Sequence, residues 1–185
     1  VLNPDVVLNQ DTMSKINNTI FNLENFAILS PISDNPHFPN YRANLNKIKL
    51  EDSNVIEEVE EIDGYSMIIN KNYFKDNIFF DEKFFMYLEN VDLCLSAKKN
   101  GGKLYIITGS KIHHLGAKAV DDKYSEQIEL SRNWHWMWSK FYFNKKHYGY
   151  IKAFLTTFNN LISAKIKFIY YLITFNKSKK IKSHK

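Results

Sequence analysis

The charge pattern of residues 88–100 most constrains the fold, because it marks both ends of one helix. Free backbone N–H groups favour anions at the start of a helix, and free carbonyl groups favour cations at its end. The segment follows this rule, with acids first and lysines last: Glu89, Asp92, Lys98 and Lys99. Gly101-Gly102 then stops the helix. The pattern therefore predicts a complete helix with defined ends.

Short apolar stretches around this helix predict strands, at residues 26–29, 65–69, 104–108 and 112–114. Residues 11–22 predict a further helix. The segment 34–52 is rich in Asn and Pro and predicts a long loop that shapes a binding site. Because helices and strands interleave along the chain, the sequence predicts a mixed α/β fold.

The composition fits one folded domain in a reducing compartment. The 185 residues are 44% hydrophobic and 15% aromatic, which is enough for a core and excludes disorder throughout. Cys94 is the one cysteine, so the chain cannot form an internal disulfide. We therefore expect a cytoplasmic setting.

The end of the chain is strongly basic and amphipathic. Residues 145–185 hold ten lysines and no Asp or Glu, which leaves 15 basic against 20 acidic residues before them. Such a tail suits an anionic surface, either membrane or nucleic acid. Apolar residues recur at spacings of three and four from Ile151 to Ile173, and lysines interrupt them. We expect residues 148–185 to associate with the membrane surface without spanning it, and we expect no nucleic-acid partner.

Four short signals could carry chemistry, and each also has a purely structural explanation. Asp5 in Asn3-Pro4-Asp5 could bind a divalent cation, or it could belong to a simple turn. The pair His113-His114 could project into a cleft, or it could be an ordinary surface or core pair. The aromatic cluster 132–142 could lie at a membrane boundary, or it could belong to the core.

The fourth signal, residues 79–94, mixes acids with aromatic residues. Glu89 and Asp92 share one helical turn, where they could act as a general base or simply cap the helix. Phe84, Phe85 and Tyr87 precede them, and an aromatic wall of this kind would desolvate a carboxylate and raise its basicity.

Taken in order, five motifs resemble the later part of family 2 glycosyltransferases of the rhamnosyltransferase-like type. These motifs are NPDV at 3–6, DGYSMIIN at 63–70, the long segment 79–107, HHLGAKA at 113–119 and SRNWHWMWSKF at 131–141. The resemblance covers residues 1–147. It implies an α/β nucleotide-binding fold of the GT-A type with a mixed sheet, whose earlier half precedes Val1 and holds most base and ribose contacts. The amphipathic helical tail would follow this domain.

The resemblance also implies roles for individual residues. Asp5 and His114 match the acid and the histidine that hold a divalent cation, Mg²⁺ or Mn²⁺. The positions that would line the donor or acceptor cleft are Asp63 and Gly64. Glu89 falls in the acidic pair that supplies the base. The second member of that pair is Asn90 here, which cannot accept a proton, so Glu89 is the first candidate for the base and Asp92 the second.

The implied activity is inverting transfer of a sugar from a nucleotide-diphosphate sugar. The acceptor would be a hydroxyl of a cell-surface polysaccharide or a lipid-linked saccharide, at the inner face of a bacterial plasma membrane. The alternative is a catalytically degenerate relative that serves as a membrane-associated glycan-binding or partner domain.

Overall fold

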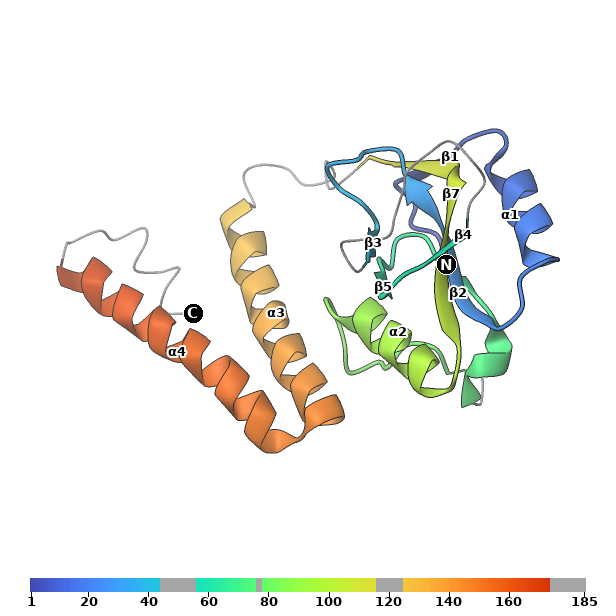
Figure 1. The fold of residues 1–185 in the computed structure, drawn as a ribbon. Helices are drawn as coiled ribbons and strands as arrows, with labels where there is room; N and C mark the ends of the chain where they lie inside the picture. The colour runs from blue at the N-terminus through green and yellow to red at the C-terminus, as the bar shows by residue number, and fades with distance from the viewer. Residues whose placement is uncertain (44–55, 76–77, 116–124, 174–185) are drawn as a thin grey trace. The chain divides into compact units, whose positions relative to one another are not determined.

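The structure is a computed structural model that describes residues 1–43, 56–75, 78–115 and 125–173 (Figure 1). The chain divides into two compact units. The first, which we call the sheet unit, consists of Val1–Asp81 and Glu89–Lys118. The second, which we call the hairpin unit, consists of Glu82–Leu88 and Ala119–Lys185.

The sheet unit is built on a mixed five-stranded sheet in which β7 makes the most pairings. Its strands are β1 (Val6–Leu8), β2 (Phe26–Ser33), β4 (Ile56–Glu58), β6 (Ile68–Ile69) and β7 (Lys103–His114). The order is β1-β7-β2-β6, and β4 also pairs with β7. The β2–β7 pair is parallel, whereas β1, β4 and β6 pair antiparallel with their neighbours. A separate antiparallel pair joins β3 (Tyr41–Arg42) to β5 (Glu61–Ile62).

Both faces of the β2–β7 pair are buried, because successive side chains of a strand point to opposite faces. Ile106 belongs to the cluster that contains Leu93 of α2 (Glu89–Lys99). Its neighbour Ile107 belongs to the cluster that contains Ile16 of α1 (Thr12–Ile20). The two helices therefore cover opposite faces of the strand pair.

A bulge interrupts the β2–β7 register where the sequence predicted two separate strands. Pro31 pairs with Ile107, but the next residue of β2 pairs with Lys111. Proline fits such a position because it has no N–H to donate to the ladder. Helix α1 binds the carbonyl groups of the bulged segment, through Lys15 Nζ to Gly109 O at 2.7 Å and Thr12 Oγ1 to Lys111 O at 2.8 Å. With these groups satisfied, the predicted strands 104–108 and 112–114 form one strand.

The structure confirms the α/β class and corrects several predicted boundaries. The predicted helices at 11–22 and 88–100 appear as α1 and α2, and the strand at 26–29 extends to Ser33. The strand at 65–69 is shorter, because only Ile68–Ile69 pair as β6. The loop predicted at 34–52 contains β3, and its residues 44–52 lie outside the described part. Strands β4 and β5 were not predicted.

The hairpin unit consists of two helices and a short loop. Helix α3 (Ser125–Tyr148) and helix α4 (Tyr150–Ile173) pack against each other and are joined by Gly149, whose φ of 87° is in the left-handed region that glycine tolerates. The predicted boundary between residues 147 and 148 thus falls at the junction of two packed helices. The predicted helical tail is α4, and residues 174–185 lie outside the described part. No helix in the described ranges combines the length and apolar character needed to cross a bilayer.

The loop at 82–88 is fixed to α3 by hydrogen bonds and ring contacts. Ser139 Oγ donates to Met86 O at 2.6 Å, and Trp138 Nε1 donates to Lys83 O at 3.2 Å. Phe84 lies edge-on to Tyr142, with ring centroids 4.9 Å apart. This loop and the cluster predicted at 132–142 therefore form one aromatic assembly.

The two glycines after α2 provide a test of how closely this end of the helix packs against β2 and Tyr73. A Cβ added to Gly102 would lie 2.3 Å from Ala27 Cβ and 2.8 Å from a ring carbon of Tyr73, whereas a Cβ on Gly101 meets nothing within 4 Å. We predict that Gly102→Ala lowers the free energy of unfolding by about 3 kcal/mol through overpacking. Gly101→Ala should cost about 1 kcal/mol, from its φ of 82°. Urea denaturation of both variants measures the difference, and an equal cost would contradict this packing.

Candidate functional site

The candidate site lies where β2 and β7 end. These strands are parallel, and Ser33 at the end of β2 pairs with Ile112 near the end of β7. The carboxyl ends of parallel strands in α/β sheets are the usual place for ligand sites, because the following loops converge there. His113 and His114 end β7, and Asp5 precedes β1, the next strand in the sheet.

The side chains of Asp5 and His114 meet at this edge. Val6 pairs with His114 across the β1–β7 ladder, and Leu115 N donates to Asp5 O at 2.9 Å, which fixes the backbone on both sides. The side chains meet with Asp5 Oδ2 3.1 Å from His114 Nε2, and they remain 38% and 30% exposed. The structure thus brings together the two residues predicted to share a cation, in a place that a ligand can reach. Ion binding itself stays a prediction.

A second pair of the same kind lies beside the first. Asp34 Oδ2 is 2.8 Å from His113 Nδ1, and Asp34 N donates to Ile112 O at 2.9 Å. Because His113 and His114 are consecutive in a strand, their side chains point to opposite faces. The two pairs are therefore chemically similar but separate. The sequence pointed to the histidines but contained no signal for Asp34.

Tyr65 covers the His114 ring. The two rings stack with centroids 4.1 Å apart and planes 10° from parallel, which fixes the orientation of the imidazole. Burial raises the pKa of Tyr65, and a hydrogen bond with Ser33 opposes this shift. The phenol therefore stays protonated at neutral pH. Sequence analysis missed this residue because nothing local indicates which ring a strand-end histidine will meet.

Asp63 and Gly64 connect this pair to α2. Asp63 N donates to Asn40 O at 2.8 Å, and the buried Asn40 amide bonds in turn to Ser30 Oγ at 3.0 Å. Although Asp63 keeps much of its surface exposed, partial burial of its carboxyl raises its pKa; the charge of Glu61 adds to the shift and His114 opposes it.

On the other side of this segment, a Cβ at Gly64 would lie 3.4 Å from Asn90 Cβ and 3.9 Å from Glu89 Oε1. Gly64 thus touches the first turn of α2, while the next residue, Tyr65, stacks on His114. The contacts of residues 63–65 therefore bring five of the predicted positions into one neighbourhood: Asp5, Asp63, Gly64, Glu89 and His114.

Glu89 begins α2 and carries a free acceptor. Its Oε2 atom is buried and has no hydrogen-bond partner among the described residues. A buried polar atom left unpaired costs about 1–3 kcal/mol, more when it is charged, so this atom is a place where a water molecule, an ion or a ligand would bind. The second candidate, Asp92, is only 3% exposed. The whole Asp92 side chain is thus buried, whereas Glu89 is only partly buried.

The first turn of α2 is also anchored to the Asp63 segment. Asn90 Nδ2 donates to Ile62 O at 3.1 Å, and Cys94 Sγ lies 3.7 Å from the same carbonyl. Burial raises the pKa of Cys94 to about 11, so the thiol stays neutral and keeps its proton as a donor. These two contacts hold β5, and hence Asp63, against α2.

Strained backbone precedes Glu89. Tyr87 and Leu88 have φ values of 70° and 64°, and each such residue costs about 1–2 kcal/mol unless it is glycine. Of the rings predicted to surround Glu89, Phe85 lies 4.6 Å from His135 and Tyr87 lies 5.7 Å from Trp136, centroid to centroid. These rings therefore take part in the packing of the hairpin unit, and the aromatic setting of the carboxylate stays a prediction.

Comparison with protein-family models gives no match, and comparison with curated proteins gives none either. Within the described ranges, no group of three or more His, Cys, Asp or Glu side chains is arranged to hold a metal ion. Asp5 and His114 offer one carboxylate oxygen and one imidazole nitrogen, which are ligand types suited to Mg²⁺ or Mn²⁺. These ions commonly take few protein ligands and complete their shell with water and phosphate oxygens.

The two Asp–His pairs supply a matched test of the predicted cation site. We predict that Asp5→Asn weakens Mn²⁺ binding by about tenfold or more, because a neutral amide replaces a charged ligand. Asp34→Asn, which alters the His113 pair in the same way, should leave the affinity unchanged. The affinity of each variant is measured by titrating Mn²⁺ with protein and following the loss of the electron paramagnetic resonance signal of free Mn²⁺. Equal weakening by the two variants, or by neither, would exclude Asp5 as a specific ligand.

Proposed function

We propose that the chain is the catalytic part of an inverting family 2 glycosyltransferase of the GT-A type. The donor would be a nucleotide-diphosphate sugar, and the acceptor a hydroxyl of a cell-surface polysaccharide or lipid-linked saccharide. The observation that carries the proposal is the buried Oε2 atom of Glu89, which has no hydrogen-bond partner among the described residues. Glu89 lies in a helical turn that touches Gly64, and the residue after Gly64, Tyr65, stacks on His114. A base and a cation site would then border one cleft, which is what such a transfer requires.

In this proposal, Asp5 and His114 hold a divalent cation, Mg²⁺ or Mn²⁺. Their side chains are partly exposed and lie 3.1 Å apart, and the stacked Tyr65 fixes the ring. When bound, the cation would neutralise the negative charge that develops on the departing diphosphate. Asp63 and Gly64 would line the donor or acceptor cleft next to it.

Glu89 would remove the proton from the acceptor hydroxyl as that oxygen attacks the anomeric carbon. The C–O bond to the acceptor forms on the face opposite the departing diphosphate, so one displacement inverts the configuration. One carboxylate is enough, because the leaving group needs no protonation by a second acid, in contrast to glycoside hydrolysis. Helix α2 places Glu89 in its first turn, beside backbone N–H groups that have no acceptor within the helix.

One observation favours the alternative of a catalytically degenerate glycan-binding or partner domain. Asn90 donates to Ile62 O, a contact that an ionised Asp at this position could not make. The position of the second acid is thus used for structure. Both proposals place the protein at the inner face of the plasma membrane, as α4 exposes many apolar side chains and contains lysines but no acids. Binding of the donor without turnover by the complete enzyme would support the degenerate form.

The central test of the proposed activity is Glu89→Gln in the complete enzyme. This change keeps the size of the side chain and removes the proton acceptor, so turnover should fall by about 10²–10⁴-fold with donor binding little changed. Product formation and donor affinity are measured separately to distinguish these effects.

Asp92→Asn decides between the two carboxylates. Because Asp92 is buried, we expect this variant to change stability more than turnover per folded molecule. If Asp92→Asn abolished turnover while Glu89→Gln retained it, the base would be Asp92. If neither variant affected turnover in an enzyme that binds donor, the catalytic role of this helix turn would be excluded.

A further inference from the structure

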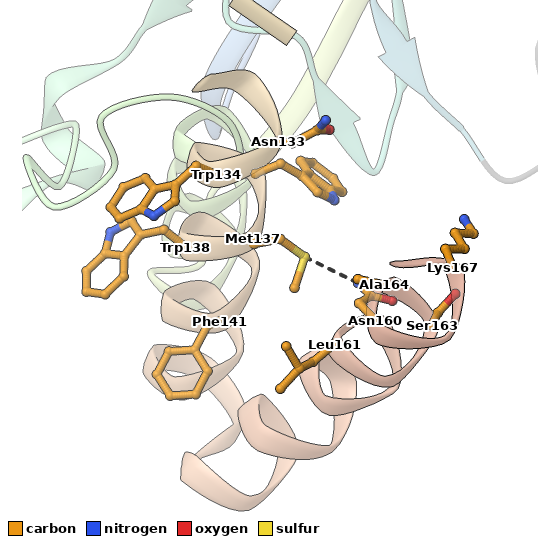
Figure 2. A pocket seen from close by; sticks show the side chains of 11 residues that line it. Asn133, Trp134, Met137, Trp138, Phe141, Asn160, Leu161, Ser163, Ala164 and Lys167 are labelled. Atoms are coloured by element: carbon orange, nitrogen blue, oxygen red, sulfur yellow. Dashed lines mark hydrogen bonds between the residues drawn. The ribbon is translucent and has the colours of Figure 1, made fainter. Parts of the chain in front are cut away.

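A groove with a cavity volume of about 670 Å³ lies between the two helices of the hairpin unit (Figure 2). This volume is in the range of ligand sites, roughly 300–1,000 Å³. Helix α3 contributes mostly aromatic side chains and α4 mostly small or polar ones. The lining residues used below are Asn133, Met137, Phe141, Leu161, Ser163 and Lys167.

The groove carries its one charged side chain at one end and an aromatic ring at the other. Figure 2 shows Asn133, Ser163 and Lys167 toward the open end, with Phe141 and Leu161 closer to the helix junction. The sequence spacing agrees, since at 1.5 Å per residue Lys167 lies about 27 Å along α4 from Gly149, and Leu161 about 18 Å. The lining thus places its charged side chain at the open end and Phe141 nearest the helix junction, with tryptophan rings between them, which suits a ligand with an anionic group and an apolar chain.

The charge of the groove selects an anion. Lys167 is the only charged residue of the lining, and no carboxylate pairs with it among the described residues. Helix α4 contains no Asp or Glu. Asn160 adds an underused donor, because its Nδ2 atom contacts Met137 Sδ at 3.5 Å, and a thioether is a weak acceptor. The ammonium group of Lys167 and the side-chain amides of Asn133 and Asn160 can thus donate hydrogen bonds to an anionic head group.

We propose that this groove binds a single phosphate-bearing lipid. The phosphate binds at the open end, near Lys167, Asn133 and Ser163, and the apolar chain lies along Met137, Phe141 and Leu161 toward the helix junction. The proposal goes beyond glycosyl transfer and stands without it, because it depends only on the hairpin unit. It also differs from adsorption of α4 to a bilayer, since one lipid molecule occupies a defined site.

Tryptophan fluorescence can measure ligand binding to the groove. The chain has three, and all of them line the groove: Trp134, Trp136 and Trp138. Intrinsic tryptophan fluorescence of the full chain therefore responds to occupation of the groove, and the variants below separate this response from changes in the contacts of Trp136 and Trp138 with the 82–88 loop. Decyl phosphate, added below its micelle concentration, should change the emission saturably. Inorganic phosphate lacks the chain and decyltrimethylammonium has the opposite charge, so both should bind at least about tenfold more weakly.

Two pairs of variants separate the groove from the general surface of α4. Ala164→Phe fills the groove and should weaken decyl phosphate binding by about tenfold or more, whereas Ile166→Phe, at an exposed position outside the lining, should not. Lys167→Gln should weaken binding by about fivefold, whereas Lys165→Gln should change it less than about twofold. Circular dichroism checks that all four variants keep their helices.

Equal effects within each pair would overturn the proposal. In particular, if Lys165→Gln and Lys167→Gln weakened binding alike and Ala164→Phe had no effect, the lysines would act as a general anionic-membrane surface. A fluorescence change that fails to saturate, or equal binding of decyltrimethylammonium, would also exclude a phosphate-lipid site.

Discussion

The parallel pairing of β2 with β7 is the constraint on which the rest of the structure depends. Both strands are buried on both faces, so a shift of one residue would move every apolar side chain to the wrong helix. The pairing also brings the ends of the two strands to one edge, where β1 adds Asp5 to the terminal histidines of β7. The site is thus a consequence of the register, and α1 stabilises that register by satisfying the carbonyl groups of the bulge.

Much of the fold could be predicted from local patterns. The ends of α2 are marked by acids, lysines and two glycines, so its bounds were predicted closely, whereas only the apolar first half of β2, residues 26–29, was predicted as strand. The sequence did not predict that β7 is one strand, because Gly109-Ser110 has the composition of a turn. This segment continues as strand because α1 binds its carbonyl groups. The short strands β4 and β5 also escaped prediction, because tertiary pairing rather than local pattern defines them.

Individual residues of the candidate site could be predicted from the sequence, but most of the contacts between them could not. Asp5 and His114 were paired in advance by their motifs, and the structure places them 3.1 Å apart. The stack of Tyr65 on His114 and the free Oε2 of Glu89 depend on contacts between distant segments, for which a single sequence gives no signal. The contacts of Phe84 and Phe85 with α3 also join segments distant in the sequence, and they could not be predicted from the acidic-aromatic motif itself.

We propose that one site joins the Asp5–His114 pair to the first turn of α2. Line broadening by bound Mn²⁺ in the ¹⁵N spectrum of the chain tests whether these residues share a site. We expect the strongest broadening at Asp5, Gly64 and Asn90, with a decrease along β7 toward Lys103, which lies about 36 Å from His114 at 3.3 Å per residue. Broadening that spares Gly64 and Asn90, or that is strongest near Lys103, would contradict it.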